Sequence, residues 1–141
     1  MVQITLTATP TEQELTAIGE SLTAFNTADV GPADRLPLAI VLRDDDGVIV
    51  GGLSAYTAWG WLYIQWLWLA ETQRGAGWAG RMLDMAETEA RRRTCHGAYI
   101  DTFNPTALKV YQRAGYTPFG ALPDFPRGRT RTFLQKPLAP V

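Results

Sequence analysis

The chain has 141 residues, of which 46% are hydrophobic, and its formal net charge is −1. This length predicts one domain over residues 1–141, and the near-neutral charge gives no electrostatic case for nucleic acid or an anionic membrane as the main partner. Cys95 is the only cysteine, which excludes an intrachain disulfide. Without a signal-like start or a run of about 18 apolar residues, we expect a cytoplasmic protein.

The first part of the chain is predicted to form a strand and a helix. Val2–Ala8 alternates polar and apolar residues, as a half-buried strand does. Thr11–Phe25 carries apolar residues at helical spacing, and Thr11 with Glu14 forms a capping-box pair at its start. Asn26–Pro37 contains one glycine and two prolines, which predicts a loop.

Three antiparallel strands are expected next. Leu38–Arg43 and Val48–Tyr56 are joined by Asp44–Gly47, whose Asp-Gly pair suits a tight hairpin. A second turn at Ala58–Gly60 leads into a strand over Trp61–Leu69.

The strand Trp61–Leu69 is predicted to be covered on both faces. Strict alternation places Trp61, Tyr63, Gln65, Leu67 and Leu69 on one face, and Leu62, Ile64, Trp66 and Trp68 on the other. Tyr63 and Gln65 are polar, and polar groups in a covered strand need partners or a cavity. They belong either to a substrate pocket or to core positions whose hydrogen bonds are satisfied.

A glycine-rich segment follows this strand; it contains Arg74, Gly75, Ala76, Gly77, Trp78, Ala79 and Gly80. Small residues let the backbone approach an anion, and the first turn of the next helix offers unpaired N–H groups with a partial positive charge. Arg74 adds a full positive charge. The segment is either a phosphate site or an ordinary strand-to-helix turn.

A helix is expected over Gly77–Arg93. Its inner face is predicted to comprise Met82, Leu83, Met85 and Ala86. Cys95 and His96 follow it and precede the next strand, which favours plain connector residues over a nucleophile or a general base. One cysteine and one histidine provide no metal-ligand set, so no metal site is predicted.

The remaining elements complete two motifs. Ala98–Phe103 is β-prone and ends at Asn104, and Thr106–Ala114 is predicted to be a helix. Arg74-x-x-Gly77-x-Ala79 resembles the Q/R-x-x-G-x-G/A loop of the GNAT superfamily of N-acetyltransferases. Asn104-x-x-Ala107-x-x-x-Tyr111-x-x-x-Gly115-Tyr116 resembles the second signature of that family. The resemblance covers roughly Val41 to Leu138.

The resemblance implies an α/β (α+β) fold with a mixed, mostly antiparallel, strongly twisted sheet flanked by helices. Because a helix crosses between them, the strands Trp61–Leu69 and Ala98–Phe103 are predicted to be parallel. Splaying of these two strands would form the slot for a coenzyme.

The family also implies acetyl-CoA as cofactor and a role for each motif. Backbone N–H groups of Arg74–Gly80 would hold the pyrophosphate, and Leu67, Trp68 and Leu69 would pair with the pantetheine arm. Asn104 would contact the pantetheine or its ordered water. Tyr111 is the expected acid that protonates the coenzyme A thiolate; the alternative is an aromatic ring that fills space between helix and sheet.

The general base is not assigned by the resemblance. Tyr63 stands where several family members carry a glutamate, so a water relayed by Gln65, Tyr63 or a backbone carbonyl is the expected route. Asp101 is the nearest carboxylate on the next strand, although an aspartate there more often caps the following turn.

The acceptor pocket is expected to include Phe25, Asn26, Tyr56, Trp59 and Phe125. Such a pocket suits an amine with apolar bulk or a cation, and the acceptor is expected to be a small-molecule or peptide amine. A non-catalytic acyl-CoA-binding sensor and a structural domain are the alternatives. The aromatic surface makes a homodimer plausible.

Overall fold

The structure is a computed structural model that describes residues 1–140. The chain forms two compact units, residues 1–33 and residues 34–141. No helix within residues 1–140 combines the length and the apolar character needed to cross a membrane.

The first unit contains one helix, α1 (Glu12–Val30). The predicted capping box is confirmed, because Thr11 Oγ1 accepts from the Glu14 amide at 3.1 Å and the Thr11 amide donates to Glu14 Oε1 at 2.8 Å. The helix continues five residues beyond Phe25, so the predicted loop starts too early. The strand predicted at Val2–Ala8 is wrong: alternation alone does not make a strand, and this segment pairs with no strand of the described chain.

The second unit is built on a six-stranded sheet in the order β1-β2-β3-β4-β6-β5. Its strands are β1 (Leu36–Arg43), β2 (Ile49–Ala58), β3 (Trp61–Leu69), β4 (Gly97–Thr102), β5 (Thr117–Pro123) and β6 (Thr130–Pro137). All pairs are antiparallel except β3 with β4. The predicted hairpin turn is confirmed, since Asp44 Oδ1 accepts from the amides of Asp46 and Val48.

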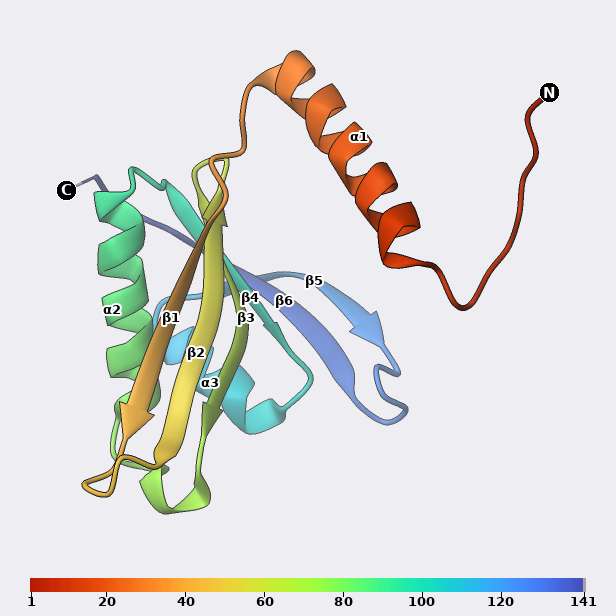
Figure 1. The fold of residues 1–141 in the computed structure, drawn as a ribbon. Coiled ribbons are helices and arrows are strands. Elements are labelled where there is room, and N and C mark those ends of the chain that lie inside the picture. Colours follow the sequence, from red (N-terminus) through yellow and green to blue (C-terminus); the bar gives the residue numbers. More distant parts are fainter. Residues whose placement is uncertain (141) are drawn as a thin grey trace. The chain divides into compact units, whose positions relative to one another are not determined.

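The central strands β3 and β4 are parallel and splay, as predicted. They pair only from Trp61 with Gly97 to Ile64 with Ile100, although β3 continues to Leu69. Beyond this point the strands β1–β3 and the strands β4–β6 diverge, and α3 (Pro105–Arg113) lies at the opening (Figure 1). The divergence forms a fork, defined here as the space between Gln65–Leu69 of β3 and Asp101–Thr102 of β4.

A β-bulge at Gln65 changes which side chains of β3 share a face. Ser54 of β2 pairs with Trp66 whereas Ala55 pairs with Ile64, so Gln65 has no partner. One extra residue inverts the alternation. Leu67 and Leu69 therefore pack on the core together with Leu62 and Ile64, and Trp66 and Trp68 are 73% and 53% exposed. The predicted face assignment is wrong beyond Gln65, and the strand is not covered on both faces there.

The helix α2 (Trp78–Arg92) packs against β1, β2 and β3. Met82, Leu83 and Ala86 are buried as predicted, but Met85 is 59% exposed, so its assignment to the inner face is wrong. At 100° per residue, Ala90 continues the stripe of Met82, Leu83 and Ala86, whereas Met85 falls outside it. The largest fully buried apolar side chains of the core are Leu62, Ile64, Leu83, Ile100 and Leu134.

Cys95 and His96 connect α2 to β4, in agreement with their interpretation as plain connector residues. The His96 amide donates to the Gly60 carbonyl and the His96 carbonyl accepts from Leu138, while the imidazole packs edge-on against Trp61 at 5.2 Å. Cys95 is buried, and burial raises the pKa of its thiol. Neither side chain lines the fork.

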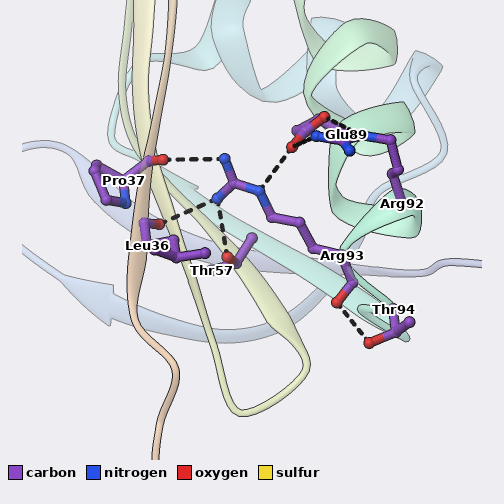
Figure 2. A network of polar contacts seen from close by, with 7 residues as sticks. All are labelled: Leu36, Pro37, Thr57, Glu89, Arg92, Arg93 and Thr94. Carbon is purple, nitrogen blue, oxygen red and sulfur yellow. Dashed lines mark hydrogen bonds and ion pairs between the residues drawn. The ribbon is translucent and has the colours of Figure 1, made fainter.

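Arg93 ties the end of α2 to the beginning of the sheet (Figure 2). Its Nε donates to Glu89 Oε2 at 2.8 Å, and Nη1 donates to Thr57 Oγ1 at 3.1 Å and to the Leu36 carbonyl at 3.3 Å. Nη2 donates to the Pro37 carbonyl at 3.1 Å. Thr57 is one of two buried polar residues in the described chain, so Arg93 satisfies a group that water does not reach.

Replacing Arg93 with methionine is expected to lower the free energy of unfolding by about 2 kcal/mol, because a buried hydroxyl and two carbonyls lose their donor. Arg92→Met is the matched control: Arg92 pairs with the same Glu89, but its side chain is 76% exposed, so solvent screens the pair and its loss should change the free energy of unfolding little. Urea denaturation of both variants measures the difference. Equal losses would contradict the role given to Arg93.

Candidate active site

The glycine-rich segment forms a turn that leaves backbone N–H groups exposed. After the short 3₁₀ turn Glu71–Gln73, Gly75 and Gly77 both have φ of +81°, a left-handed conformation that glycine adopts without strain. Gly77 is the N-cap of α2, and the first intrahelical bond runs from the Arg81 amide to the Gly77 carbonyl. The first-turn N–H groups before Arg81 therefore have no helical acceptor.

The charge around this turn suits an anion. The first turn of α2 contains no acidic residue, although acidic side chains are favourable at that position of a helix. Arg74 lies beside the turn, where its Nε donates to the Leu69 carbonyl at 3.1 Å. A Cβ built on Gly75, Gly77 or Gly80 would meet nothing within 4 Å, so the backbone faces open space.

Two cavities join the glycine turn to the fork. The first, of about 480 Å³, is lined by Leu69, Arg74, Gly75, Gly77, Trp78, Ala79, Gly80, Thr106, Val110, Arg113 and Ala114. The second, of about 390 Å³, is lined by Leu67, Trp68, Leu69, Arg74, Ala79, Thr102, Asn104, Thr106, Ala107, Val110 and Tyr111. Because they share Leu69, Arg74, Ala79, Thr106 and Val110, they form one continuous groove. The groove runs from the turn to Tyr111.

Tyr111 lies at the inner end of this groove. It is 5% exposed and belongs to the hydrophobic core, which agrees with a packing role, and it also lines the cavity. Burial, and secondarily the charge of Asp101, raises its pKa to about 12. The hydroxyl therefore stays protonated at neutral and moderately alkaline pH.

Asn104 caps α3. Its Oδ1 accepts from the amides of Thr106 at 2.9 Å and Ala107 at 3.1 Å. Asn104 also lines the groove, so the same residue fixes the start of α3 and contributes to the cavity wall.

The face of the sheet opposite the groove carries a cluster of polar side chains next to the fork. Tyr63 Oη donates to Asp101 Oδ2 at 2.8 Å, and Asp101 forms an ion pair with Arg131 at 2.8 Å. The expectation that Asp101 caps the following turn is wrong, because Thr102 Oγ1 accepts from the Asn104 amide there instead. The Tyr63 ring stacks on Tyr99 with centroids 4.5 Å apart.

The residues predicted for the acceptor pocket come from both units of the chain. Tyr56 is beside Tyr63, with ring centroids 5.7 Å apart, and the Phe125 ring lies 4.8 Å from the Arg131 guanidinium. Trp59 is in the β2–β3 turn, at the end of β3 away from the fork. Phe25 and Asn26 belong to α1 in the first unit.

Sequence reasoning missed several groove residues. Thr106, Val110 and Arg113 recur along α3 at positions i, i+4 and i+7, so they share a helix face that lines the groove. This spacing was available in the sequence as a signal. Thr102, one residue beyond Asp101, had no such signal.

Comparison with known proteins points to a single protein family. Residues 9–116 match the model of the "Acetyltransferase (GNAT) family". Acetyltransferase Atu2258 of Agrobacterium fabrum is 48% identical over 120 residues, which cover 85% of this chain and 88% of that protein. Blasticidin-S acetyltransferase of Streptomyces morookaense is 38% identical over 93 residues, covering 65% of this chain and 68% of that protein.

Solved structures share the fold. The crystal structure of a protein from Agrobacterium tumefaciens described as an acetyltransferase has a TM-score of 0.91 and 43% identity, covering 96% of this chain and 99% of that one. An acetyltransferase from Bacillus cereus has a TM-score of 0.85 at 24% identity, covering 95% of this chain and 98% of that one.

Proposed function

The chain belongs to the GNAT family of acetyltransferases and uses acetyl-CoA as its cofactor; from this we propose that it acetylates a primary amine of a small molecule or peptide by direct attack in a ternary complex. The observation that carries the proposal is the continuous groove from the glycine turn to Tyr111. It joins backbone N–H groups of the glycine turn to a protonated hydroxyl beside the fork.

The chemical groups along the groove suit two different parts of the coenzyme, its pyrophosphate and its pantetheine arm. The free N–H groups of residues 75–80 and the positive end of α2 suit the pyrophosphate, with Arg74 and Arg113 beside them. Beyond Ile64, β3 no longer pairs with β4, so one edge of Leu67–Leu69 is available to the amides of the pantetheine arm. Bound this way, acetyl-CoA would place its thioester at the fork near Tyr111.

Tyr111 is the proposed general acid. Acetyl-CoA would supply the activated acetyl group, and the acceptor amine would give up one proton to a base as its nitrogen bonds to the carbonyl carbon and the C–S bond breaks. The departing thiolate takes a proton from the Tyr111 hydroxyl. A raised pKa makes Tyr111 a weaker acid than an exposed tyrosine, but it also ensures that the proton is present when the thiolate forms.

Aromatic residues on the sheet face opposite the groove favour an acceptor with apolar or cationic character. Tyr56, Tyr63 and Tyr99 lie side by side there, at the level where the fork opens. Aromatic faces bind apolar groups and also attract cations. The 38% identity with a protein named Blasticidin-S acetyltransferase supports a small-molecule amine, such as an antibiotic, as one class to test.

The test is an acetyl-CoA-dependent screen that follows thiol release with blasticidin S, spermidine, single amino acids and short peptides as acceptors. We expect turnover with at least one primary amine, and mass spectrometry should find the acetyl group on that amine. Coenzyme A binding without turnover on any acceptor would instead support the acyl-CoA-binding sensor.

A further inference from the structure

The strand β4 places a carboxylate at the closed end of the fork. Ile100 is the last residue of β4 that pairs with β3, and Asp101 follows it. Thr102 lines the groove on the α3 side, so Asp101, its neighbour on an extended strand, points to the opposite face. None of the residues that line the two cavities is acidic, whereas Asp101 borders the fork, where the thioester is proposed to lie.

Three contacts fix this carboxylate. Asp101 Oδ2 accepts from Tyr63 Oη at 2.8 Å, and Oδ1 accepts from Nε and Nη2 of Arg131, each at 2.8 Å. The Asp101 side chain is only 12% exposed. Charge-assisted hydrogen bonds of this length hold Tyr63, Asp101 and Arg131 in one arrangement.

The surroundings orient the Tyr63 hydroxyl. Its ring lies between the parallel-stacked Tyr99, at an interplanar angle of 11°, and the edge-on Tyr56. Burial first, and then the Asp101 carboxylate, raises the pKa of Tyr63, so its oxygen carries a proton and donates it to Asp101. The lone pairs of that oxygen remain available to accept an N–H.

Tyr111 lines the groove, whereas Tyr63 lines neither of its two cavities. Tyr63 contacts Asp101 directly at 2.8 Å, and the charge of Asp101 also contributes, after burial, to the raised pKa of Tyr111. The charged and titratable groups that surround the Tyr63–Asp101 pair are Arg35, Tyr56, Tyr99, Tyr111 and Arg131.

We propose, on the premise of acetyl transfer given above, that Tyr63 is a catalytic residue that removes the amine proton and relays its own proton to Asp101. As the N–C bond forms, the N–H bond breaks to Tyr63 Oη while the Tyr63 proton moves to Asp101 Oδ2. Tyr111 protonates the thiolate from the other side. A proton from Asp101 then returns through solvent to Tyr111, so one amine and one thioester give one amide and one thiol.

Asp101 and Arg131 act through Tyr63 and are positioning residues. Arg131 keeps the carboxylate oriented, and Asp101 receives the proton that Tyr63 releases. General base catalysis of this kind contributes roughly 10²- to 10⁴-fold to a rate.

The experiment compares Tyr63→Phe, Asp101→Asn and the double variant, using the acceptor with the highest wild-type turnover in the amine screen. Each single substitution should lower kcat by about 10²-fold or more, with little change in the KM for acetyl-CoA or in the melting temperature. The double variant should be no slower than the slower single variant, because both residues serve one relay. Arg92→Met changes an exposed side chain that lines neither cavity and should keep kcat near the wild-type value.

Two results would overturn the relay: near wild-type kcat in Tyr63→Phe when chemistry is rate-limiting, or defects that multiply in the double variant. If Asp101→Asn does not fold, the comparison of Tyr63→Phe with Arg92→Met decides the question. Absence of turnover in the wild type with every amine would be a failure of the acetyl-transfer proposal itself, and is recognised before any variant is made.

Discussion

Tyr111→Phe is expected to lower kcat by roughly 10²- to 10⁴-fold while leaving the KM for acetyl-CoA nearly unchanged. The substitution keeps the ring that packs in the core and removes only the proton donor at the end of the groove. Steady-state thiol release over a range of acetyl-CoA concentrations separates the two constants.

The pH dependence of the free energy of unfolding gives a second test of the environment of Tyr111. Its pKa in the fold is about 12 and an exposed tyrosine has a pKa near 10, so the folded chain holds this proton more tightly than the unfolded chain. The corresponding stability is complete below pH 10 and is lost as the pH rises toward 12. Tyr111→Phe should reduce that alkaline loss in urea titrations. A variant that keeps full kcat, with chemistry rate-limiting, would show that Tyr111 only fills space.

Gly80→Glu is expected to weaken coenzyme A binding by about 100-fold or more without destabilising the fold. Gly80 lies in the first turn of α2 and lines the groove, and a Cβ at this position would meet no heavy atom within 4 Å. A glutamate there replaces glycine, which is a poor helix former, and its negative charge is favourable at a helix N-terminus. The same charge repels a pyrophosphate, and 100-fold in affinity corresponds to about 2.7 kcal/mol.

Gly19→Glu provides the matched control, since Gly19 is also helical and a Cβ there would also meet free space. Calorimetric titration with coenzyme A should give the wild-type Kd for Gly19→Glu and a much higher Kd for Gly80→Glu. Gly77 is not suited to such a substitution, because its φ of +81° would strain any β-branched residue. Unchanged affinity in Gly80→Glu would place the phosphate site elsewhere.

Local patterns in the sequence were sufficient to predict several features of the fold. The capping box at Thr11 and the glycine turn before α2 depend on neighbouring residues, so their patterns are readable from a short segment. The parallel pairing of β3 and β4 followed from a helical crossover, which imposes a direction on the second strand.

Features that depend on distant residues could not be predicted. The bulge at Gln65 is set by pairing between β2 and β3, and a single extra residue exchanged the faces assigned to Trp66 and Leu67. The hydrogen bond from Tyr63 to Asp101 spans 38 residues of sequence. Neither has a local pattern.

The burial of polar residues also could not be predicted from the sequence. Glu87 is 2% exposed on α2, where Lys136 Nζ donates to Oε1 at 2.6 Å and Tyr116 Oη donates to Oε2 at 3.0 Å. The two partners come from other parts of the chain, and only their convergence makes burial of a carboxylate tolerable. A charged residue on an amphipathic helix is ordinarily predicted to face solvent.

Hydrogen–deuterium exchange of the full chain with and without coenzyme A tests the central claim most directly, because it reports on the backbone amides assigned to the coenzyme. We predict slower exchange at residues 75–80 and at Leu67–Leu69, with the β1–β2 hairpin turn at Asp44–Gly47 unchanged. Binding of coenzyme A that leaves exchange at residues 75–80 unaltered would contradict the account.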